Sequence, residues 1–394
     1  MSSRIRFESG KVQGERMILL SNGGHNTHRA AKPSDTIVVG TVDGIAILSR
    51  IENRWAVSHR ALAGCNVSAV TIADDGTLFA ATHGVGVARS RDHGKTWQWV
   101  NNGIDRHDLW AARAGKLQGK DVVLVGSLPA HLYISEDAGD SWRELSALRE
   151  VGSAENWCFP PPPRVGHIKE IVLDGNRLMV GIEIGALLVS TDFGKSFADL
   201  KVDPIIGEND IHRILVNPAR PDRILIANGI VGVMTSDDNG KTWRKNPMPP
   251  EANYPDPMVI HPDQPDLVFL TAGVGWPPHW YKLGRARGKM FRSRDAGQTW
   301  ERLLGGLPNG QRATFGALTI EAWDKGYGLY AADTDGQVFE SLDGGDSWCI
   351  IADVAAVSKG EFYRGLVKDR VALATVDDVA FTAVATARLA AVKA

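Results

Sequence analysis

One eight-residue pattern, S-x-D-x-G-x-[ST]-[WF], occurs six times along the chain and narrows what the chain can fold into. The first copy runs from Ser90 to Trp97, and the serines of successive copies are 45, 55, 46, 57 and 48 residues apart. The copies start at Ser90, Ser135, Ser190, Ser236, Ser293 and Ser341. Spacings of about 40–50 residues are typical of a four-stranded propeller blade, so the sequence predicts a ring of such blades.

The pattern has the chemistry of a hairpin turn. The serine ends one strand, the aspartate accepts from backbone N–H groups, the glycine supplies a positive φ, and the aromatic residue begins the next strand. A residue that recurs in every blade is a poor candidate for a unique site. We therefore interpret these aspartates as turn residues rather than as catalytic groups or calcium ligands.

Short apolar runs before each copy supply the remaining strands of a blade, as in 67–73, 78–82 and 85–89. The same order recurs upstream at 36–40 and 44–49, where Asn53-Arg54-Trp55 is a shortened turn. The sequence thus predicts an all-β fold, a single seven-bladed β-propeller of four-stranded antiparallel blades with Asp-box turns. The predicted blades are roughly 24–62, 66–101, 107–147, 165–201, 211–247, 256–304 and 313–356, with a tail, 357–394, that closes or caps the ring.

Ring closure needs a strand from one terminus, because an open propeller would leave an unpaired edge. Residues 11–21 and two apolar runs in the tail, at 371–375 and 379–384, are the candidates. The sequence does not choose between them.

The six motifs resemble those of the Asp-box, or bacterial neuraminidase repeat, propellers, a group that includes sialidases, sortilin-type receptors and photosystem II assembly factors. The resemblance covers roughly residues 36–350. It implies the fold rather than a function, because the group contains enzymes, receptors and scaffolds. Sialidases resemble one another in an early Arg-Ile-Pro motif, which this chain lacks, so we do not expect a true sialidase.

Composition limits the partners. A net charge of −2 gives no support for binding nucleic acid, and no stretch of roughly 18 apolar residues predicts a membrane span. The first ten residues lack the apolar core of a secretion signal, so we expect a cytoplasmic protein. The three cysteines are widely scattered and predict neither a disulfide framework nor a thiolate zinc site.

Blade topology places two sets of positions on the face opposite the Asp-box turns: the starts of first strands and the turns between second and third strands. Histidine is frequent in both sets. The starts carry His28, Asn66, His107, Asp108, His167, His212 and Asp256, and the turns carry Asp43, His83, His131, Glu183, Asn228 and Asp333.

Equivalent positions on different blades converge around the channel axis, and histidines that converge in this way predict a metal centre. Neutral imidazole suits zinc, iron or manganese, and a carboxylate completes many catalytic sites. We expect His28, His107, His167 and His212 as ligands of a divalent transition metal, with Glu183, His83 and His131 as catalytic groups. No linear motif such as H-E-x-x-H supports this, and a histidine at the start of a strand is often a hydrogen-bonded structural residue.

Two insertions, 149–166 and 275–287, reach the same face and carry aromatic and basic residues. Long loops on a regular scaffold are commonly functional. We expect them to form the walls of a pocket for a small organic substrate, aromatic or anionic. The predicted substrate-binding residues are Trp157, Phe159, Trp276, His279, Trp280, Tyr281 and Arg285.

The favoured function is a metal-dependent enzyme acting on a small-molecule substrate, with hydrolase or lactonase chemistry first and oxygenase or lyase chemistry as further options. A non-catalytic intracellular scaffold for binding or assembly is one alternative. A glycan-active or glycan-binding propeller is another. The sequence does not indicate an oligomeric state.

Overall fold

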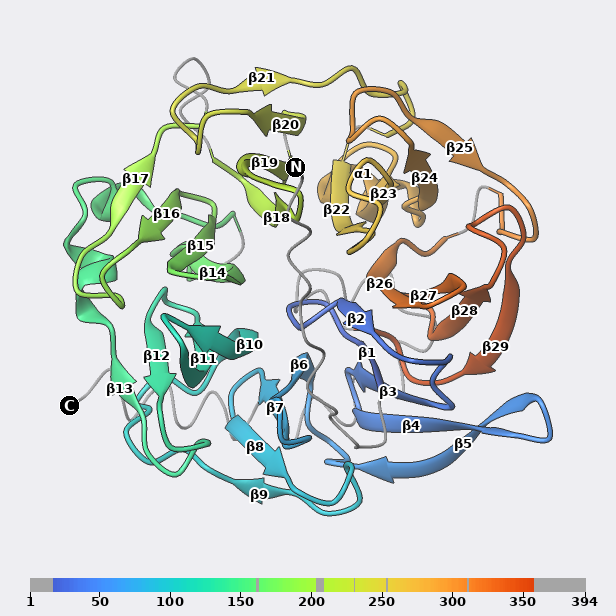
Figure 1. The fold of residues 1–394 in the computed structure, drawn as a ribbon, viewed down its shortest axis with the longest axis horizontal. Coiled ribbons are helices and arrows are strands. Elements are labelled where there is room, and N and C mark those ends of the chain that lie inside the picture. Colours follow the sequence, from blue (N-terminus) through green and yellow to red (C-terminus); the bar gives the residue numbers. More distant parts are fainter. Residues whose placement is uncertain are drawn as a thin grey trace, which may run out of the picture.

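A computed structural model describes residues 17–160, 163–202, 209–229, 231–252, 254–309 and 312–357. Its strands form seven sheets arranged as blades around a central axis, which confirms the predicted seven-bladed propeller (Figure 1). In blades 2 to 7 the four strands of the meander pair antiparallel in sequence order, and in blades 2 to 6 the first of them lies nearest the axis (Figure 1).

The first four blades contain the following strands. Blade 1 consists of β1 (Ile18–Leu20), β3 (Thr36–Thr41), β4 (Gly44–Ile51) and β5 (Arg54–Ala61). Blade 2 consists of β6 (Val67–Ile72), β7 (Leu78–Thr82), β8 (Gly86–Ser90) and β9 (Gln98–Trp99). Blade 3 consists of β10 (Leu109–Leu117), β11 (Lys120–Ser127), β12 (Leu132–Ser135) and β13 (Arg143–Glu144). Blade 4 consists of β14 (His167–Asp174), β15 (Arg177–Glu183), β16 (Leu187–Ser190) and β17 (Ala198–Leu200).

The last three blades follow the same plan. Blade 5 consists of β18 (Ile211–Asn217), β19 (Arg220–Asn228), β20 (Gly232–Ser236) and β21 (Arg244–Lys245). Blade 6 consists of β22 (Tyr254–Ile260), β23 (Val268–Gly273), β24 (Lys289–Ser293) and β25 (Glu301–Leu303). Blade 7 consists of β26 (Phe315–Trp323), β27 (Gly326–Asp333), β28 (Gln337–Ser341) and β29 (Cys349–Asp353), and it also binds β2 (Thr27–Arg29).

The core lies between neighbouring blades. Leu124 and Leu132 of blade 3, for example, belong to one buried cluster with Ile168 and Val180 of blade 4. Alternate residues of each strand face the two neighbouring blades, so both faces are covered, and the inner strands are buried nearly throughout. This burial on both faces explains why the sequence shows short continuous apolar runs rather than strict alternation.

The Asp-box turns have the predicted hydrogen bonds. In the first turn, Ser90 Oγ donates to Asp92 Oδ1 at 2.8 Å and accepts from Gly94 N at 2.9 Å, and Asp92 Oδ1 accepts from Thr96 N at 2.8 Å. Gly94 has a φ of +82°, as expected. Hydrogen bonds, chiefly from Thr96, lower the pKa of Asp92 to about 2. The carboxylate is therefore occupied in holding the turn.

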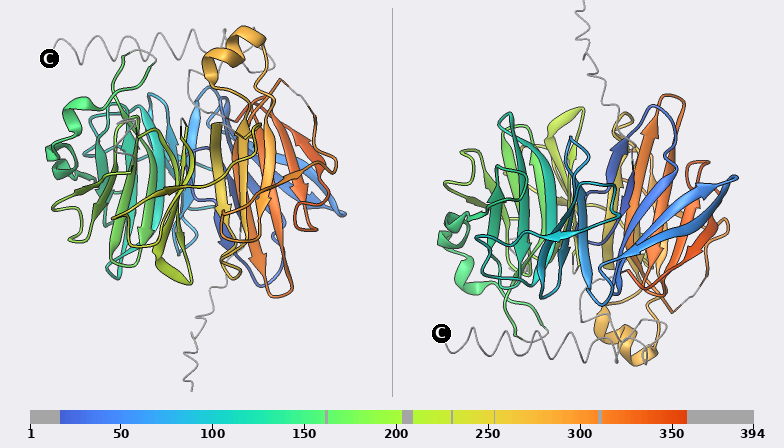
Figure 2. Two further views of the ribbon diagram at one scale, coloured as in Figure 1. Left: turned by 90° about the horizontal axis from the view of Figure 1, so that it is seen from above. Right: turned by 90° about the horizontal axis from the view of Figure 1, so that it is seen from below.

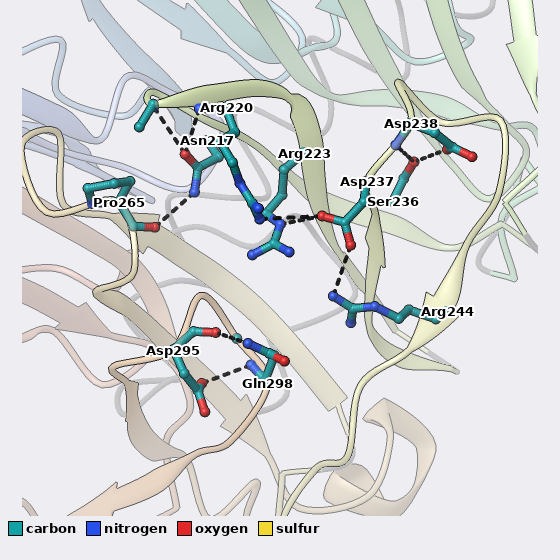
Figure 3. Close-up of polar contacts among 12 residues, drawn as sticks. Asn217, Arg220, Arg223, Ser236, Asp237, Asp238, Arg244, Pro265, Asp295 and Gln298 are labelled. Carbon is teal, nitrogen blue, oxygen red and sulfur yellow. Dashed lines mark hydrogen bonds and ion pairs between the residues drawn. The ribbon is translucent and has the colours of Figure 1, made fainter.

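In blade 5 the same turn is surrounded by arginines (Figure 3). Ser236 Oγ donates to Asp238 Oδ1 at 2.8 Å, as in the other copies. The carboxylate of the neighbouring residue, Asp237, forms an ion pair with Arg223 and a second ion pair, at 3.3 Å, with Arg244. Arg244 and Asp237 are both about half exposed, so their ion pair contributes little stability, whereas the serine of the turn is buried and its hydrogen bonds are costly to lose.

Blade 1 departs from the repeat at both ends. Its third and fourth strands are joined by Glu52 and Asn53, which have φ of 48° and 63° and form a two-residue hairpin in place of an Asp box. Its innermost strand, β1, pairs parallel with β3, and β2 pairs parallel with β26. Blade 1 therefore begins at Ile18 instead of residue 24, and residues 27–29 belong to the sheet of blade 7.

Strand β1 lies within the 11–21 segment that we considered for ring closure. The alternative closing strands of the tail lie outside the described residues. The insertion of blade 6, residues 275–287, forms helix α1 (Pro277–Leu283), which stands out from one face of the ring (Figure 2). The insertion between blades 3 and 4 contains two 3₁₀ turns, η1 (Ser146–Glu150) and η2 (Ala154–Asn156). No helix among the described residues is both long and apolar enough to cross a membrane.

Candidate functional site

Blades 4 and 5 bring five ionisable side chains together where their first strands begin. His167 and Glu183 are register partners in β14 and β15, so their side chains lie on the same face of the sheet. Lys169, two residues after His167, lies at an irregularity of that pairing, and His212 lies at the corresponding irregularity of blade 5. Asp210 precedes β18 directly. We call these five residues the channel-end cluster.

Glu183 is the centre of the channel-end cluster. Its Oε2 lies 3.4 Å from His167 Nε2 and 3.5 Å from Lys169 Nζ, and its Oε1 lies 3.6 Å from His212 Nε2. Asp210 Oδ1 lies 3.2 Å from the same His212 nitrogen. All five side chains are buried. Burial of this many charges is unfavourable unless they compensate one another, so the cluster is a feature that needs an explanation.

The tautomer of His212 is set by a backbone group. Its Nδ1 lies 2.6 Å from the carbonyl oxygen of Pro255, which only accepts hydrogen bonds, so Nδ1 carries a proton. When the ring is neutral, Nε2 therefore presents a lone pair to Asp210 and Glu183. At this point His212 Nε2 and Asp210 Oδ1 have no partner in hydrogen-bond geometry among the described residues. Neither has Glu183 Oε2, the carboxylate oxygen that faces His167 and Lys169.

A proton or a metal ion at His212 Nε2 would interact favourably with this nitrogen and with the carboxylate oxygens that face it. Burial alone lowers the pKa of His212, but Asp210 and Glu183 outweigh it and raise this pKa to about 10. Burial alone raises the pKa of Glu183, but Lys169 and His212 hold it well below its usual range. Burial also lowers the pKa of His167, so that ring is neutral near pH 7. With His212 neutral, the channel-end cluster has two carboxylates and one ammonium group.

The donor set fits a divalent metal ion. One ligand atom from each of Glu183, Asp210 and His212 lies within 4.8 Å of the others. Ligand atoms about 2.1 Å from a tetrahedral ion are about 3.4 Å apart. The separations of 3.2 and 3.6 Å at His212 Nε2 agree with that value. A hydrogen bond from the other ring nitrogen to a carbonyl is also what metal-bound histidines usually make.

Gly229 leaves room for this group. A Cβ atom at this position would lie 2.1 Å from Asp210 Oδ2 and 2.8 Å from His212 Nε2. Its amide also donates to the carbonyl oxygen of Asp210 at 2.9 Å. Any side chain here would displace Asp210 and His212, so the arrangement of these two residues requires a glycine at this position.

Aromatic rings enclose the channel-end cluster. Trp110 packs against His167, with ring centroids 3.8 Å apart, and Phe159 packs against the same imidazole at 4.7 Å. Tyr254 covers His212 at 4.9 Å. Trp110 also contacts His83, at 4.5 Å, whose Nδ1 is 3.0 Å from Asp108 Oδ1. These rings lower the local dielectric constant and strengthen the interactions among the charges inside.

The structure thus brings together three of the predicted site residues, His167, His212 and Glu183, but does not assemble the four-histidine ligand set. His28 lies in β2, opposite Glu321 of blade 7, stacks on His25 at 5.0 Å and accepts from Leu19 N through Nε2 at 3.4 Å. The Nε2 atom of His107 lies 3.1 Å from the carbonyl oxygen of Ile104, in the connection before β10.

The two predicted catalytic histidines of blades 2 and 3 pair with carboxylates other than Glu183. His83 forms an ion pair with Asp108, and its ring packs against Trp110. His131 Nδ1 lies 2.9 Å from Glu144 Oε1, and its ring stacks on Tyr133. Glu144 belongs to β13, the outermost strand of blade 3, so His131 points away from the axis. Histidines at equivalent positions of different blades therefore do not all meet at the axis, because each turn directs its side chain differently.

The predicted pocket residues divide into buried and exposed groups. Trp157 packs against the core between blades 3 and 4, and Phe159 contacts His167. Trp280 is fully buried and contacts Tyr254 at 5.2 Å. Trp276 is 51% exposed. His279 accepts from Trp276 Nε1 at 3.2 Å, Arg285 is exposed, and the side chain of Tyr281 lies outside the described part of the structure.

Two members of the channel-end cluster were not predicted from the sequence. Asp210 stands two residues before His212, in a loop position that the repeat does not define. Lys169 would point to a neighbouring blade in a regular strand, and the irregular pairing between Ile168 and Glu170 changes its direction. The Asp-x-His spacing was the one signal available, because alternate residues at the start of a strand share a face.

Comparisons with known proteins agree with this fold. The sequence profile of the Sortilin-Vps10 family, described as sortilin, neurotensin receptor 3, matches residues 185–308. An oligoxyloglucan-reducing end-specific xyloglucanase of Emericella nidulans is 29% identical over 133 residues, which are 31% of this chain and 15% of that protein. A probable enzyme of the same name from Neosartorya fischeri is 21% identical over 197 residues, 44% of this chain and 22% of the relative. The matches thus span less than a quarter of either relative.

Among solved structures, the GH74 xyloglucanase from Xanthomonas campestris has a TM-score of 0.62 at 18% identity, covering 85% of this chain and 55% of that one. YCF48 bound to D1 peptide has a TM-score of 0.51 at 17% identity, covering 84% and 88%. These likenesses establish the fold alone. With the six turns, they make the chain a seven-bladed Asp-box β-propeller.

Proposed function

We propose that this protein is a metal-dependent hydrolase of small organic substrates, with a zinc, iron or manganese ion held by Glu183, Asp210 and His212. One observation carries the proposal: the buried atoms His212 Nε2 and Asp210 Oδ1, 3.2 Å apart, have no partner in hydrogen-bond geometry among the described residues, and a ligand atom of Glu183 lies within 4.8 Å of the ligand atoms of both residues. Buried polar atoms without partners are rare in stable proteins, and a bound ion is one of the standard explanations.

Each residue of the channel-end cluster then has a task. A bound divalent ion would supply Lewis acidity and a nucleophilic water at neutral pH. Pro255 orients His212 through Nδ1. His167, neutral and 3.4 Å from Glu183, is placed to take a proton at Nε2. Lys169 offsets part of the carboxylate charge, and Trp110 excludes water from the imidazole.

Helix α1 connects the channel-end cluster to solvent. Buried Trp280 contacts Tyr254, and Tyr254 contacts His212, so the helix rests on the aromatic cover of the ligand. The exposed residues Trp276, His279 and Arg285 lie on this insertion. They offer an aromatic surface and positive charge, which suit an aromatic or anionic substrate.

Metal content of the untagged protein tests the proposal. Wild type should contain close to one ion per chain by mass spectrometry, and His212→Ala and Asp210→Ala should lose it. His107→Ala is the matched control, because it removes an imidazole outside the channel-end cluster and should retain the ion. Gly229→Ala keeps every ligand but places a methyl group between them, so it should also lose the ion while circular dichroism stays unchanged. A metal-free wild type would refute the proposal and favour a scaffold.

Glycan hydrolysis is a second candidate, favoured by the sequence similarity to the xyloglucanase of Emericella nidulans. Glu183 and Asp210 would then act as the carboxylic acid and carboxylate that such reactions require. Treatment with a chelator separates the two candidates. Hydrolysis of xyloglucan oligosaccharides that survives the chelator and is lost in Glu183→Gln would support the glycosidase, whereas activity restored by added metal would support the metal-dependent enzyme.

A further inference from the structure

The N-terminal segment 17–29 passes through the middle of the ring (Figure 1). Its central part, Ser21–Asn26, forms hydrogen bonds with blades 2 to 7 in turn. The segment donates four of these bonds: Gly23 N to Ser68 O at 2.9 Å and His25 N to Val70 O at 3.2 Å in blade 2, Asn26 Nδ2 to Met258 O at 3.3 Å in blade 6, and Asn22 Nδ2 to Gly316 O at 2.8 Å in blade 7. It accepts the other three. Gly23 O accepts from Ala112 N of blade 3 at 3.1 Å, Asn22 Oδ1 from Lys169 Nζ of blade 4 at 2.8 Å, and Asn22 O from Arg213 of blade 5.

The segment fits with almost no spare room. A Cβ atom on Gly23 would lie 2.1 Å from the carbonyl oxygen of Trp110, and one on Gly24 would lie 2.2 Å from that of Val70. Asn22 uses both ends of its amide, accepting from Lys169 and donating to Gly316. The ring therefore distinguishes Asn-Gly-Gly from sequences of similar polarity.

The segment is bound by strand pairing at both ends. Ile18, Leu19 and Leu20 of β1 are fully buried against blade 1, and β2 adds to blade 7. These two pairings are parallel, whereas every other strand pairing among the described residues is antiparallel. The segment is thus not a step of the meander that builds the blades. Its parallel pairing with blades 1 and 7 resembles that of a separate peptide strand added to the edge of a sheet.

We infer that the ring formed by residues 36–357 is a peptide-binding site, filled by the chain's own residues 17–29. It binds an extended peptide that has three apolar residues followed by Ser-Asn-Gly-Gly. Backbone hydrogen bonds supply affinity, and the contacts of Asn22 and the two glycines supply specificity, as in recognition by strand addition. The connection to β3 contains the exposed residues Ala31, Lys32 and Pro33, so cleaving it leaves the contacts intact.

The test uses the full chain with a site-specific protease sequence inserted between Ala31 and Lys32. After cleavage, an excess of labelled peptide 17–31 is added, and its incorporation is followed by fluorescence anisotropy and native mass spectrometry. The inference expects one peptide per ring, in place of the cleaved segment. A peptide with Gly23→Ala should incorporate more than about tenfold less, and so should one with Asn22→Ala. Ala31→Ser, at an exposed position of the peptide beyond β2, is the control and should exchange normally.

A second measurement is needed in case the cleaved segment exchanges with the labelled peptide too slowly to observe. Gly23→Ala is introduced into the uncut chain, and the product is examined by limited proteolysis and circular dichroism. A bound peptide predicts a folded ring in which residues 17–29 become sensitive to protease. A chain that fails to fold, or one that still protects the segment, would show that the segment is an integral part of the propeller and overturn the inference. Metal content does not enter either readout, so this result is separate from the proposed hydrolase.

Discussion

Lys169 Nζ donates a hydrogen bond to Asn22 Oδ1 at 2.8 Å and lies 3.5 Å from Glu183 Oε2. One ammonium group thus connects the segment inside the ring with the carboxylate at the centre of the channel-end cluster. Because Glu183 is a proposed metal ligand, this positive charge competes with any cation that the carboxylate binds.

Lys169→Met should therefore bind divalent cations more tightly than wild type, by about tenfold or more, since like charges this close repel strongly in a buried site. The variant should also lose about 1–3 kcal/mol of stability, because Asn22 Oδ1 loses its donor. Isothermal titration with the chelated protein measures the affinity. Lys120→Met, which removes a largely exposed ammonium group, is the control. Equal affinity in both variants would argue against Glu183 as a ligand.

Asp333 gives a pH-dependent prediction away from the channel-end cluster. Burial raises its pKa to about 7 although the carboxylate accepts from Gln337 N and Asp335 N. The folded state then holds a proton that the unfolded chain releases near its ordinary pKa of 3.8. Its favourable contribution is present below about pH 4 and is lost as the pH rises through about 7.

Asp333→Asn keeps an acceptor for both backbone groups without the charge. It should match wild type at pH 4 and exceed it by about 2–4 kcal/mol at pH 8. Urea unfolding of both proteins at the two pH values gives the difference. A difference that does not change with pH would show that the carboxyl group is not protonated in the folded protein.

The blade 6 insertion offers a comparison of two tryptophans. Trp280 is fully buried against Tyr254, whereas Trp276 is 51% exposed. Trp280→Ala should cost about 3–5 kcal/mol, because it opens a cavity beneath helix α1. Trp276→Ala should change stability by less than about 0.5 kcal/mol. Thermal unfolding measures both, and a large loss in Trp276→Ala would mean that this ring packs against another surface.

The Asp-box turn of blade 5 tests the role of the motif (Figure 3). Ser236 Oγ accepts from the buried Gly240 N at 2.8 Å, so Ser236→Ala leaves that amide without a partner. We expect a loss of about 1–3 kcal/mol in chemical denaturation with no change in metal content. Ser58→Ala, on the exposed strand β5, should be close to neutral. A neutral Ser236→Ala would mean that water replaces the hydroxyl.

The repeat made the fold predictable, because each Asp box fixes one hairpin and its spacing fixes the blade. The same reasoning selected Glu183, His167 and His212, which occupy true strand ends. It misplaced His28, because the sequence does not reveal that β1 and β2 run parallel to their partners. It missed Lys169, because the irregular pairing of β14 turns this side chain inward, and such irregularities depend on the neighbouring blade.

The hydrogen bond from Asn22 to Gly316 joins positions 294 residues apart in the chain. Residues 17–29 are made before the blades, yet blade 7, which holds β2, is made after the other six. Strand β1 can pair with β3 as soon as blade 1 is made, but β2 and Asn22 reach their partners in blade 7 only when most of the ring exists. Closing such a long loop is slow. The centre of the ring is therefore completed only together with its last blade, although the residues that fill it are made before the blades.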